Sequence, residues 1–391
     1  MQDKNLDIFC DSYDFELPPS LIALTPIDPK EKARLLIYKR SNRQVTHSHF
    51  ANLFDFIPRD YLVVLNESRV IPARFFGTRL EHKNGFYERT NSKREFLYHK
   101  PCAGGFLAWT KGRVRKGDLF ITNSGRVLVE ILSMGDGGYR EIGFYSLESF
   151  TPRLASAANA RVRESKIPVV LDSKKALDEG EVLAFLEEEG SMPLPPYIKR
   201  AATREDCKDY QSIFARVSGS IAAPTASLHF SESMLAALKA SYEIAFVTLH
   251  VGAGTFSPLV VENILEHKMH AEFCALSLDS ARRIAGAKKI LCVGTTALRC
   301  VEWFGLVNGL GGAGARLEDA WQLSGENEIF LHPLNRPRLA SALLTNFHLP
   351  KSTLLMLVSS LIGRAETLRI YNEALSAGYR FYSYGDGMLI I

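Results

Sequence analysis

The sequence lacks the short signatures of several common enzyme classes. Its 391 residues contain no GxSxG, HExxH or CxxC motif, so serine hydrolase, zinc protease and thioredoxin-type chemistry have no support. Gly252 and Gly254 resemble the start of a dinucleotide-binding fingerprint, but Ser257 occupies the place of its third glycine. Ser352 and Thr353 follow a lysine as in a phosphate loop, yet no GxxxxG precedes them. The usual nucleotide-binding loops are therefore excluded.

Cysteine is scarce, and long apolar runs are missing. The six cysteines show no paired spacing, which is typical of reduced thiols in a cytosolic protein. The first residues contain no basic start followed by an apolar core, so we expect no signal peptide. The longest apolar run near the end, residues 354–362, is interrupted by two serines and is too short to span a bilayer. We expect a cytoplasmic protein without membrane contact.

Net charge is also small, but it is distributed unevenly. The formal total is +4, whereas residues 79–116 contain ten Lys or Arg against three Glu, which gives +7 there and −3 elsewhere. A local basic excess of this kind indicates a phosphate-bearing partner such as a nucleic acid backbone. A solvated charged face is the alternative, and the sequence leaves both open.

The pattern of apolar residues divides the chain into two kinds of segment. Buried strands such as residues 61–65 and 290–293 alternate with helical stretches, which is typical of an α/β fold. From about residue 75 to 150, short alternating runs are separated by glycine, asparagine and lysine, which indicates a small β-barrel or sandwich. We therefore predict a mixed-sheet α/β domain, formed by residues 1–70 and 151–391, with a small β-barrel inserted at 71–150.

Polar or small residues follow the ends of four predicted strands. Polar groups at strand ends are a common place for a ligand site in α/β sheets, although each could be an ordinary turn. The candidates after the strands at 61–65 and 244–251 are Asn66, Arg69, Arg74, Gly252, Gly254, Thr255 and Phe256. Those after the strands at 290–293 and 342–345 are Thr295, Thr296, Arg299, Asn346, Phe347 and Lys351.

Three histidines accompany aromatic and hydroxyl-bearing residues in these loops. They are His229 beside Phe230, His250 before Phe256, and His348 after Phe347. If the loops converge, they form an aromatic pocket with several acid or base groups, suited to an uncharged ring and a cationic or zwitterionic ligand. The alternative for each histidine is a place in the core.

Two further stretches contribute candidates, and one is rejected. Prolines between residues 193 and 196 fix an extended path that presents Tyr197 and Arg200, and small residues around Thr225 permit close approach of a ligand. The histidines at 267 and 270 lie near two glutamates, but their spacing fits no common zinc pattern. We predict no metal site.

Seven strings of residues, in this order, resemble one known family. They are NESRVIPAR (66–74), PLPPYI (193–198), APTASLHF (223–230), LHVGAGTF (249–256), VGTT (293–296), TNFHLPKST (345–353) and FYSYGD (381–386). Together they resemble the S-adenosylmethionine:tRNA ribosyltransferase-isomerases of queuosine biosynthesis. The resemblance extends from about residue 11 to the C-terminus.

The resemblance implies a reaction that composition cannot reveal. The family transfers and isomerises the ribosyl part of S-adenosylmethionine onto 7-aminomethyl-7-deazaguanine at the tRNA wobble position, releasing adenine and methionine and leaving epoxyqueuosine. The implied partners are S-adenosylmethionine, consumed as a co-substrate, and a tRNA anticodon stem-loop. No resident cofactor is implied, and we expect a monomer. The family's fold, an α/β domain with an inserted small β-barrel, agrees with the change of pattern near residue 75.

The resemblance also suggests roles for the candidate residues. A base must remove an acidic proton next to the sulfonium, and an acid must assist the departing adenine; His229, His250 and His348 are the candidates, with their roles unassigned. The methionine carboxylate could bind Arg74, Arg299 or the turn of Thr295 and Thr296. The stacking candidates are Tyr197, Phe230, Phe256 and Phe347. The alternatives are a non-catalytic tRNA-binding protein on the same scaffold and an S-adenosylmethionine-dependent tRNA methyltransferase.

Overall fold

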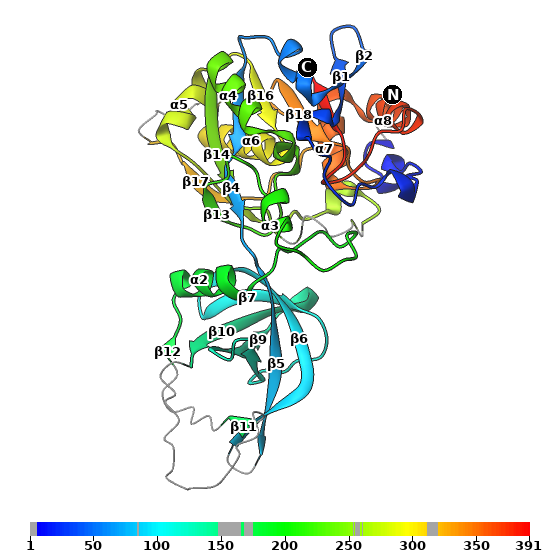
Figure 1. The fold of residues 1–391 in the computed structure, drawn as a ribbon. Coiled ribbons are helices and arrows are strands. Elements are labelled where there is room, and N and C mark those ends of the chain that lie inside the picture. Colours follow the sequence, from blue (N-terminus) through cyan, green and yellow to red (C-terminus); the bar gives the residue numbers. More distant parts are fainter. Residues whose placement is uncertain are drawn as a thin grey trace. The chain divides into compact units, whose positions relative to one another are not determined.

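The computed structural model describes residues 6–83, 86–147, 166–167, 175–252, 254, 259, 261–310 and 320–391 (Figure 1). The chain forms two compact units. Unit 1 comprises Met1–Val70, Pro195–Arg200 and Lys208–Ile391, and unit 2 comprises Ile71–Leu194 and Ala201–Cys207. In the part that the structure describes, no helix combines the length and the apolar character needed to cross a membrane.

Unit 1 is built on a mixed sheet of nine strands. Their order is β17-β15-β14-β3-β16-β18-β19-β1-β2. The bounds are β1 (Arg34–Lys39), β2 (Gln44–His49), β3 (Leu62–Asn66), β14 (Ile244–Leu249), β15 (Glu272–Leu276), β16 (Ile290–Val293), β17 (Ser324–Asn327), β18 (Ala342–Asn346) and β19 (Gly387–Ile390). A separate parallel pair is formed by β4 (Ser68–Val70) and β13 (Val217–Ser220).

The central strands are apolar along their length because both faces of the sheet are covered. In β3, Leu62 and Val64 belong to one hydrophobic cluster, while Val63 and Leu65 belong to another. The first cluster includes residues of α5 (Leu278–Gly286), α6 (Thr295–Asn308), α7 (Thr353–Ile362) and α8 (Arg364–Ser376). The second includes residues of α4 (Glu232–Ser241). Side chains alternate between the faces of a strand, so each strand contributes to both layers.

The strand order brings four of the quoted strings to one edge of the sheet. Strands β14, β3, β16 and β18 are neighbours, and every adjacent pair among them is parallel. Their carboxyl ends therefore lie along one edge, where ligand sites of α/β sheets commonly form. The short 3-10 helix η7 (Thr225–His229) contacts β18. The α/β prediction is confirmed, and this edge positions the candidate site.

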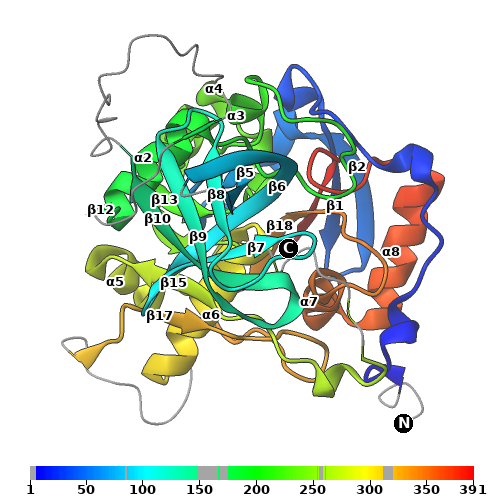
Figure 2. The ribbon, with the colours of Figure 1, turned by 90° about the horizontal axis from the view of Figure 1, so that it is seen from below.

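Unit 2 is dominated by antiparallel strands. They are β5 (Arg74–Lys83), β6 (Phe86–Cys102), β7 (Gly105–Thr110), β8 (Leu119–Thr122), β9 (Val127–Met134) and β10 (Tyr139–Ser146), with the short β11 (Lys166–Ile167) and β12 (Lys175–Ala176). Strands β6, β5, β8, β9, β10 and β7 pair in succession, and β7 pairs with β6, so the pairings close a ring; its strands can be followed in Figure 2.

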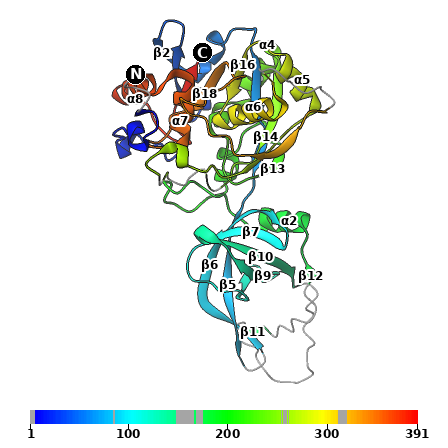
Figure 3. The ribbon, with the colours of Figure 1, turned by 180° about the vertical axis from the view of Figure 1, so that it is seen from behind.

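Unit 2 extends beyond residue 150, where the sequence predicts the end of the insertion. Helix α2 (Glu179–Glu189) lies at one end of the ring (Figure 3), and its Phe185 meets the Phe75 ring edge-on at 5.5 Å. Phe75 in turn stacks on Phe96 at 5.1 Å. The amphipathic pattern of α2 shows that it has an apolar face, but not which unit that face packs against. The short α3 (Asp206–Asp209) lies where the chain passes from unit 2 to unit 1.

Candidate active site

A cavity of about 480 Å³ opens in unit 1 beside the carboxyl ends of β16 and β18. Ligand pockets of small molecules commonly have volumes of roughly 300–1,000 Å³. Eight of the predicted site residues line it: Tyr197, Thr225, Thr295, Thr296, Asn346, Phe347, His348 and Lys351. They come from four of the quoted strings, so the fold brings together residues that are far apart in the chain.

His348 is the histidine that lines the cavity. Its Nε2 lies 2.8 Å from the Thr345 hydroxyl oxygen, and its backbone N–H donates to the Tyr371 hydroxyl at 3.1 Å. Burial lowers the pKa of His348 from its ordinary value to about 3. The ring is therefore neutral at physiological pH. A pKa this low makes it a weak base, but it leaves a nitrogen able to accept a hydrogen bond.

His229 does not line the cavity, but it contacts Asn346, which does. Its ring stacks on Phe50 at 4.0 Å, and its Nε2 lies 3.2 Å from Asn346 Nδ2. Thr225 donates its hydroxyl to the Asn346 carbonyl oxygen at 2.9 Å. Burial, with smaller contributions from the cations Arg380 and Lys30, lowers the pKa of His229 to about 3. The neutral ring thus helps to fix the orientation of the Asn346 amide, which does line the cavity.

His250 follows β14 and is not among the residues that line the cavity. Its Nδ1 lies 2.7 Å from Ser68 Oγ, which lies 2.7 Å from Ser220 Oγ. Ser220 Oγ also accepts the Val251 N–H at 2.9 Å. Burial lowers the pKa of His250 below its ordinary value. The His250 ring packs against the backbone of Gly219. A Cβ at position 219 would lie only 2.6 Å from His250 Nε2, so a glycine is needed there to leave room for the ring.

Asn66 and Arg299 support the strand ends from within the protein. The Asn66 amide accepts the Leu249 N–H at 3.0 Å and donates to the Leu249 carbonyl at 3.1 Å, so it joins the ends of β3 and β14. Arg299 is buried and forms an ion pair with Glu272, whose other oxygen accepts the Gly252 N–H at 2.9 Å. Neither side chain lines the cavity, and both have their hydrogen-bonding groups engaged.

The other predicted residues lie in varied surroundings. Phe230 is buried in the second hydrophobic cluster, edge-on to Phe214, and Gly254 lies against the His270 ring. Arg69 donates to Ser218 Oγ at 3.2 Å, and Arg200 is exposed. Arg74 belongs to unit 2, where its Nε lies 3.1 Å from Glu95 Oε1. Thr255 and Phe256 lie outside the described residues.

Lys351 lines the cavity, but its charge is already compensated. Its Nζ lies 2.9 Å from carboxylate oxygens of both Asp11 and Asp14, and these hydrogen bonds raise the pKa of Lys351 above its ordinary value. Its backbone is left-handed, with φ at 54°, and its N–H donates to the Tyr13 carbonyl at 3.0 Å. The lysine therefore connects the cavity to the segment that carries Asp11 and Asp14.

Three tyrosines at the cavity include two that the sequence did not single out. The Tyr197 ring lies 4.3 Å from that of Tyr382, and its hydroxyl accepts the Ser383 N–H at 3.1 Å. Tyr210 is fully buried and lines the cavity, and burial raises its pKa well above the ordinary value. Tyr382 lies in the quoted string at 381–386, which was a usable signal, whereas nothing in the sequence around Tyr210 distinguishes it.

Two hydroxyl groups in the cavity lining are unsatisfied within the described part of the chain. The Tyr210 hydroxyl lies near the Ala223 backbone and Ser383 but forms no hydrogen bond of good geometry, and Thr296 Oγ1 also has no partner. Thr296 lies in the first turn of α6, a helix of 14 residues whose N-terminus carries partial positive charge. Buried polar groups are nearly always paired, so these two indicate a polar ligand.

Comparison with known proteins places the chain among close relatives. The family profile described as "Queuosine biosynthesis protein" matches residues 10–390. The chain is 41% identical over 395 residues to the S-adenosylmethionine:tRNA ribosyltransferase-isomerase of Helicobacter hepaticus, covering 98% of this chain and 97% of that protein. Identity to the protein of the same name from Helicobacter acinonychis is 43% over 390 residues, covering 99% of this chain and 100% of that protein. A solved structure of S-adenosylmethionine tRNA ribosyltransferase from Thermotoga maritima shows 24% identity, coverage of 97% of this chain and 100% of that chain, and a TM-score of 0.49.

Proposed function

Because the chain belongs to the family of queuosine biosynthesis proteins, we propose that it transfers the ribosyl moiety of S-adenosylmethionine to tRNA and isomerises it. The acceptor is 7-aminomethyl-7-deazaguanine at the wobble position of an anticodon stem-loop. Adenine and methionine leave, and epoxyqueuosine remains in the RNA. S-adenosylmethionine is consumed, so the protein needs no resident cofactor for this reaction.

The observation that supports this function best is the composition of the unit 1 cavity. Its lining combines tyrosine rings, a neutral histidine, an amide and hydroxyl groups, and its single charged side chain among the described lining residues, Lys351, is already paired. Tyrosine faces suit a sulfonium cation, and hydroxyl and amide groups suit the edge of a purine. The N-terminus of α6, with Thr295 and Thr296, suits the methionine carboxylate.

We assign different roles to the three histidines. His348 lines the cavity and is neutral, so it accepts a hydrogen bond from the substrate and orients it. His229 positions the Asn346 amide. His250, through the serines at 68 and 220, positions the backbone that follows β14. Only the first role involves contact with the reacting molecules.

The function is tested by mass analysis of the RNA product. A purified anticodon stem-loop carrying 7-aminomethyl-7-deazaguanine is incubated with the protein and S-adenosylmethionine. A ribosyl-derived cyclopentane adduct, with free adenine and methionine, is the expected result. A methyl shift would instead make the protein a methyltransferase, and unchanged RNA that still binds would make it a non-catalytic tRNA-binding protein.

The remaining proposals concern organisation. We propose that the closed ring of strands in unit 2 is the small inserted barrel of this family, and that unit 1 carries the catalytic machinery. We also propose that the protein is cytoplasmic, since the substrate is tRNA. We further propose that it is a monomer. Light scattering of the purified protein, with and without RNA, tests the monomeric state; a dimeric mass in both conditions would contradict it.

A further inference from the structure

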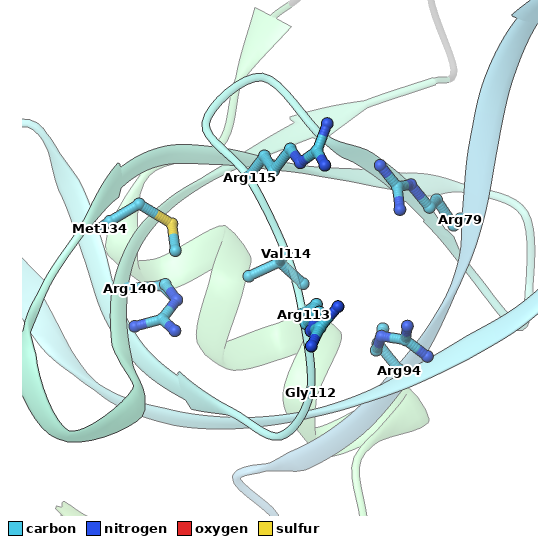
Figure 4. A pocket seen from close by; sticks show the side chains of 8 residues that line it. All are labelled: Arg79, Arg94, Gly112, Arg113, Val114, Arg115, Met134 and Arg140. Atoms are coloured by element: carbon cyan, nitrogen blue, oxygen red, sulfur yellow. The ribbon is translucent and has the colours of Figure 1, made fainter.

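Unit 2 contains a second cavity, of about 610 Å³, whose lining is dominated by arginine. Its lining residues are Arg79 of β5, Arg94 of β6, Met134 of β9, Arg140 of β10 and, in the loop between β7 and β8, Gly112, Arg113, Val114 and Arg115. In Figure 4 this loop passes between Arg140 with Met134 on one side and Arg79 with Arg94 on the other. Five guanidinium groups thus surround one hollow.

These arginines carry more positive charge than nearby residues neutralise. Asp118 pairs with Arg79 at 2.5 Å, and its other oxygen accepts the Arg115 backbone N–H at 2.8 Å. Throughout the part of the chain that the structure describes, no other carboxylate forms an ion pair with any of the five arginines. Among the described residues, four guanidinium groups at this cavity therefore have no carboxylate partner, and their mutual repulsion is unfavourable.

Two of the arginines also have unsatisfied donors. Among the described residues, Arg94 Nε and Arg140 Nε are shielded from solvent and have no hydrogen-bond acceptor. Arg94 Nη1 donates to the Lys93 carbonyl at 3.1 Å, and Arg140 Nη1 donates to the Gly135 carbonyl at 3.0 Å. Backbone carbonyls satisfy part of each guanidinium but leave its charge uncompensated. An anion with several oxygens would satisfy both the charge and the remaining donors.

We propose that this cavity binds backbone phosphates of the substrate RNA. A guanidinium group matches the geometry of phosphate, with two parallel N–H donors. One phosphate would leave most of the five charges uncompensated, and the exposed Lys93, Lys111 and Lys116 extend the positive surface beyond the cavity. A chain of phosphates fits this distribution better than a single small anion. That the RNA is a tRNA rests on the proposed function; the phosphate site rests on the arginines.

The test is equilibrium binding of a fluorescein-labelled anticodon stem-loop RNA to the full chain at several salt concentrations. The Arg113→Gln/Arg115→Gln variant removes two exposed side chains of the cavity, so the folded core stays intact. We expect its Kd to rise about tenfold or more, and the slope of log K against log salt to fall by roughly 1.5, because each lost phosphate contact removes roughly 0.7–0.9. The Arg113→Lys/Arg115→Lys variant, which keeps charge but loses the bidentate geometry, should be intermediate.

A matched control separates this site from general charge. Lys239→Gln/Lys288→Gln removes two exposed positive charges from unit 1, and we expect a change in Kd of less than about twofold. Equal weakening by both double variants would overturn the proposal. A second result would also overturn it: tripolyphosphate raises the melting temperature of the wild type but not of the arginine variant, while the two proteins bind RNA with equal Kd. The cavity would then be a site for a small polyanion and not for RNA. Binding requires no turnover, so a wild type that binds RNA through these arginines yet forms no product would contradict only the proposed function.

Discussion

The two cavities differ in how their linings could recognise a ligand. The unit 1 cavity has hydroxyl groups, one amide, tyrosine rings and a neutral histidine, and its lysine is paired with two aspartates. Among the residues that the structure describes, the unit 2 cavity is lined by five arginines, of which Arg79 is paired with Asp118. Binding through hydrogen bonds and ring faces depends on the shape and chemical identity of the ligand. Binding through charge depends on the ligand's net charge and on the salt concentration. The first lining suits discrimination of a small molecule, and the second suits a repeating backbone.

The largest expected effect concerns His348. Replacing it with Asn should lower kcat by about 10²-fold, because it removes the imidazole that forms a preorganised hydrogen bond to the substrate in the cavity. His47→Gln, at an exposed position in β2, is the control and should retain activity. Steady-state turnover with the stem-loop RNA measures both. If the His348 variant were as active as the His47 control, His348 would have no catalytic role. The unit 1 cavity would then no longer differ from the unit 2 cavity in this respect.

A second prediction concerns acid sensitivity. The folded-state pKa of His348 and of His229 is lowered to about 3, so the unfolded chain binds more protons below pH 6.5 and stability falls as pH decreases. For each of the two histidines, the free energy of unfolding should fall by about 2 kcal/mol as the pH decreases from 6.5 to 5.

Urea unfolding across this pH range checks that expectation. Replacing His348 with Gln should flatten the dependence, whereas Arg113→Gln should leave it unchanged. If both variants kept the wild-type slope, the acid sensitivity would have another origin.

A third prediction concerns the unsatisfied hydroxyl groups. Tyr210→Phe removes a buried hydroxyl that has no partner, so stability should change by less than about 1 kcal/mol, while the affinity for S-adenosylmethionine should fall about tenfold. Isothermal titration and thermal unfolding measure the two effects. The salt dependence of RNA binding should stay as in the wild type, in contrast to the arginine variants. A large loss of stability with unchanged affinity would mean that the hydroxyl is structural.

The smallest expected effect concerns repulsion among the arginines. Added NaCl should stabilise the wild type by screening them, and Arg94→Gln should reduce this gain, by less than about 1 kcal/mol. Thermal unfolding at increasing salt is the measurement, with Lys239→Gln as the control. An identical salt response in all three proteins would show that the arginines do not repel one another measurably.

The strand ends were predictable because their signal is local. A buried apolar run followed by a polar loop is visible in the sequence, and this pattern identifies His348, Asn346 and Thr296 as candidates. The pairing of Arg299 with Glu272 could not be foreseen, since the two residues are 27 positions apart and lie in different elements, α6 and β15. Arg299 was expected to bind substrate, yet its guanidinium is engaged inside the protein.

The limits of prediction are similar for the fold. The alternating strands of unit 2 were visible as a change of pattern near residue 75. The boundary after them was not, because helix α2 packs through Phe185 onto Phe75, which lies 110 residues earlier. Tyr210 was missed for a related reason: its burial depends on residues from distant loops. Local patterns therefore identify elements and strand ends, while partners distant in sequence require the structure.

The pairing of Lys351 with Asp11 and Asp14 makes this lysine a chemical reporter. Amine-reactive reagents attack unprotonated lysine, and the two aspartates keep its ammonium group protonated by raising its pKa. Acylation at Lys351 should therefore be slow while the segment around Asp11 and Asp14 is docked, and faster whenever it detaches. Peptide mapping after a short exposure to such a reagent would then time the detachment of this segment from Lys351, a residue that lines the cavity, without an engineered probe.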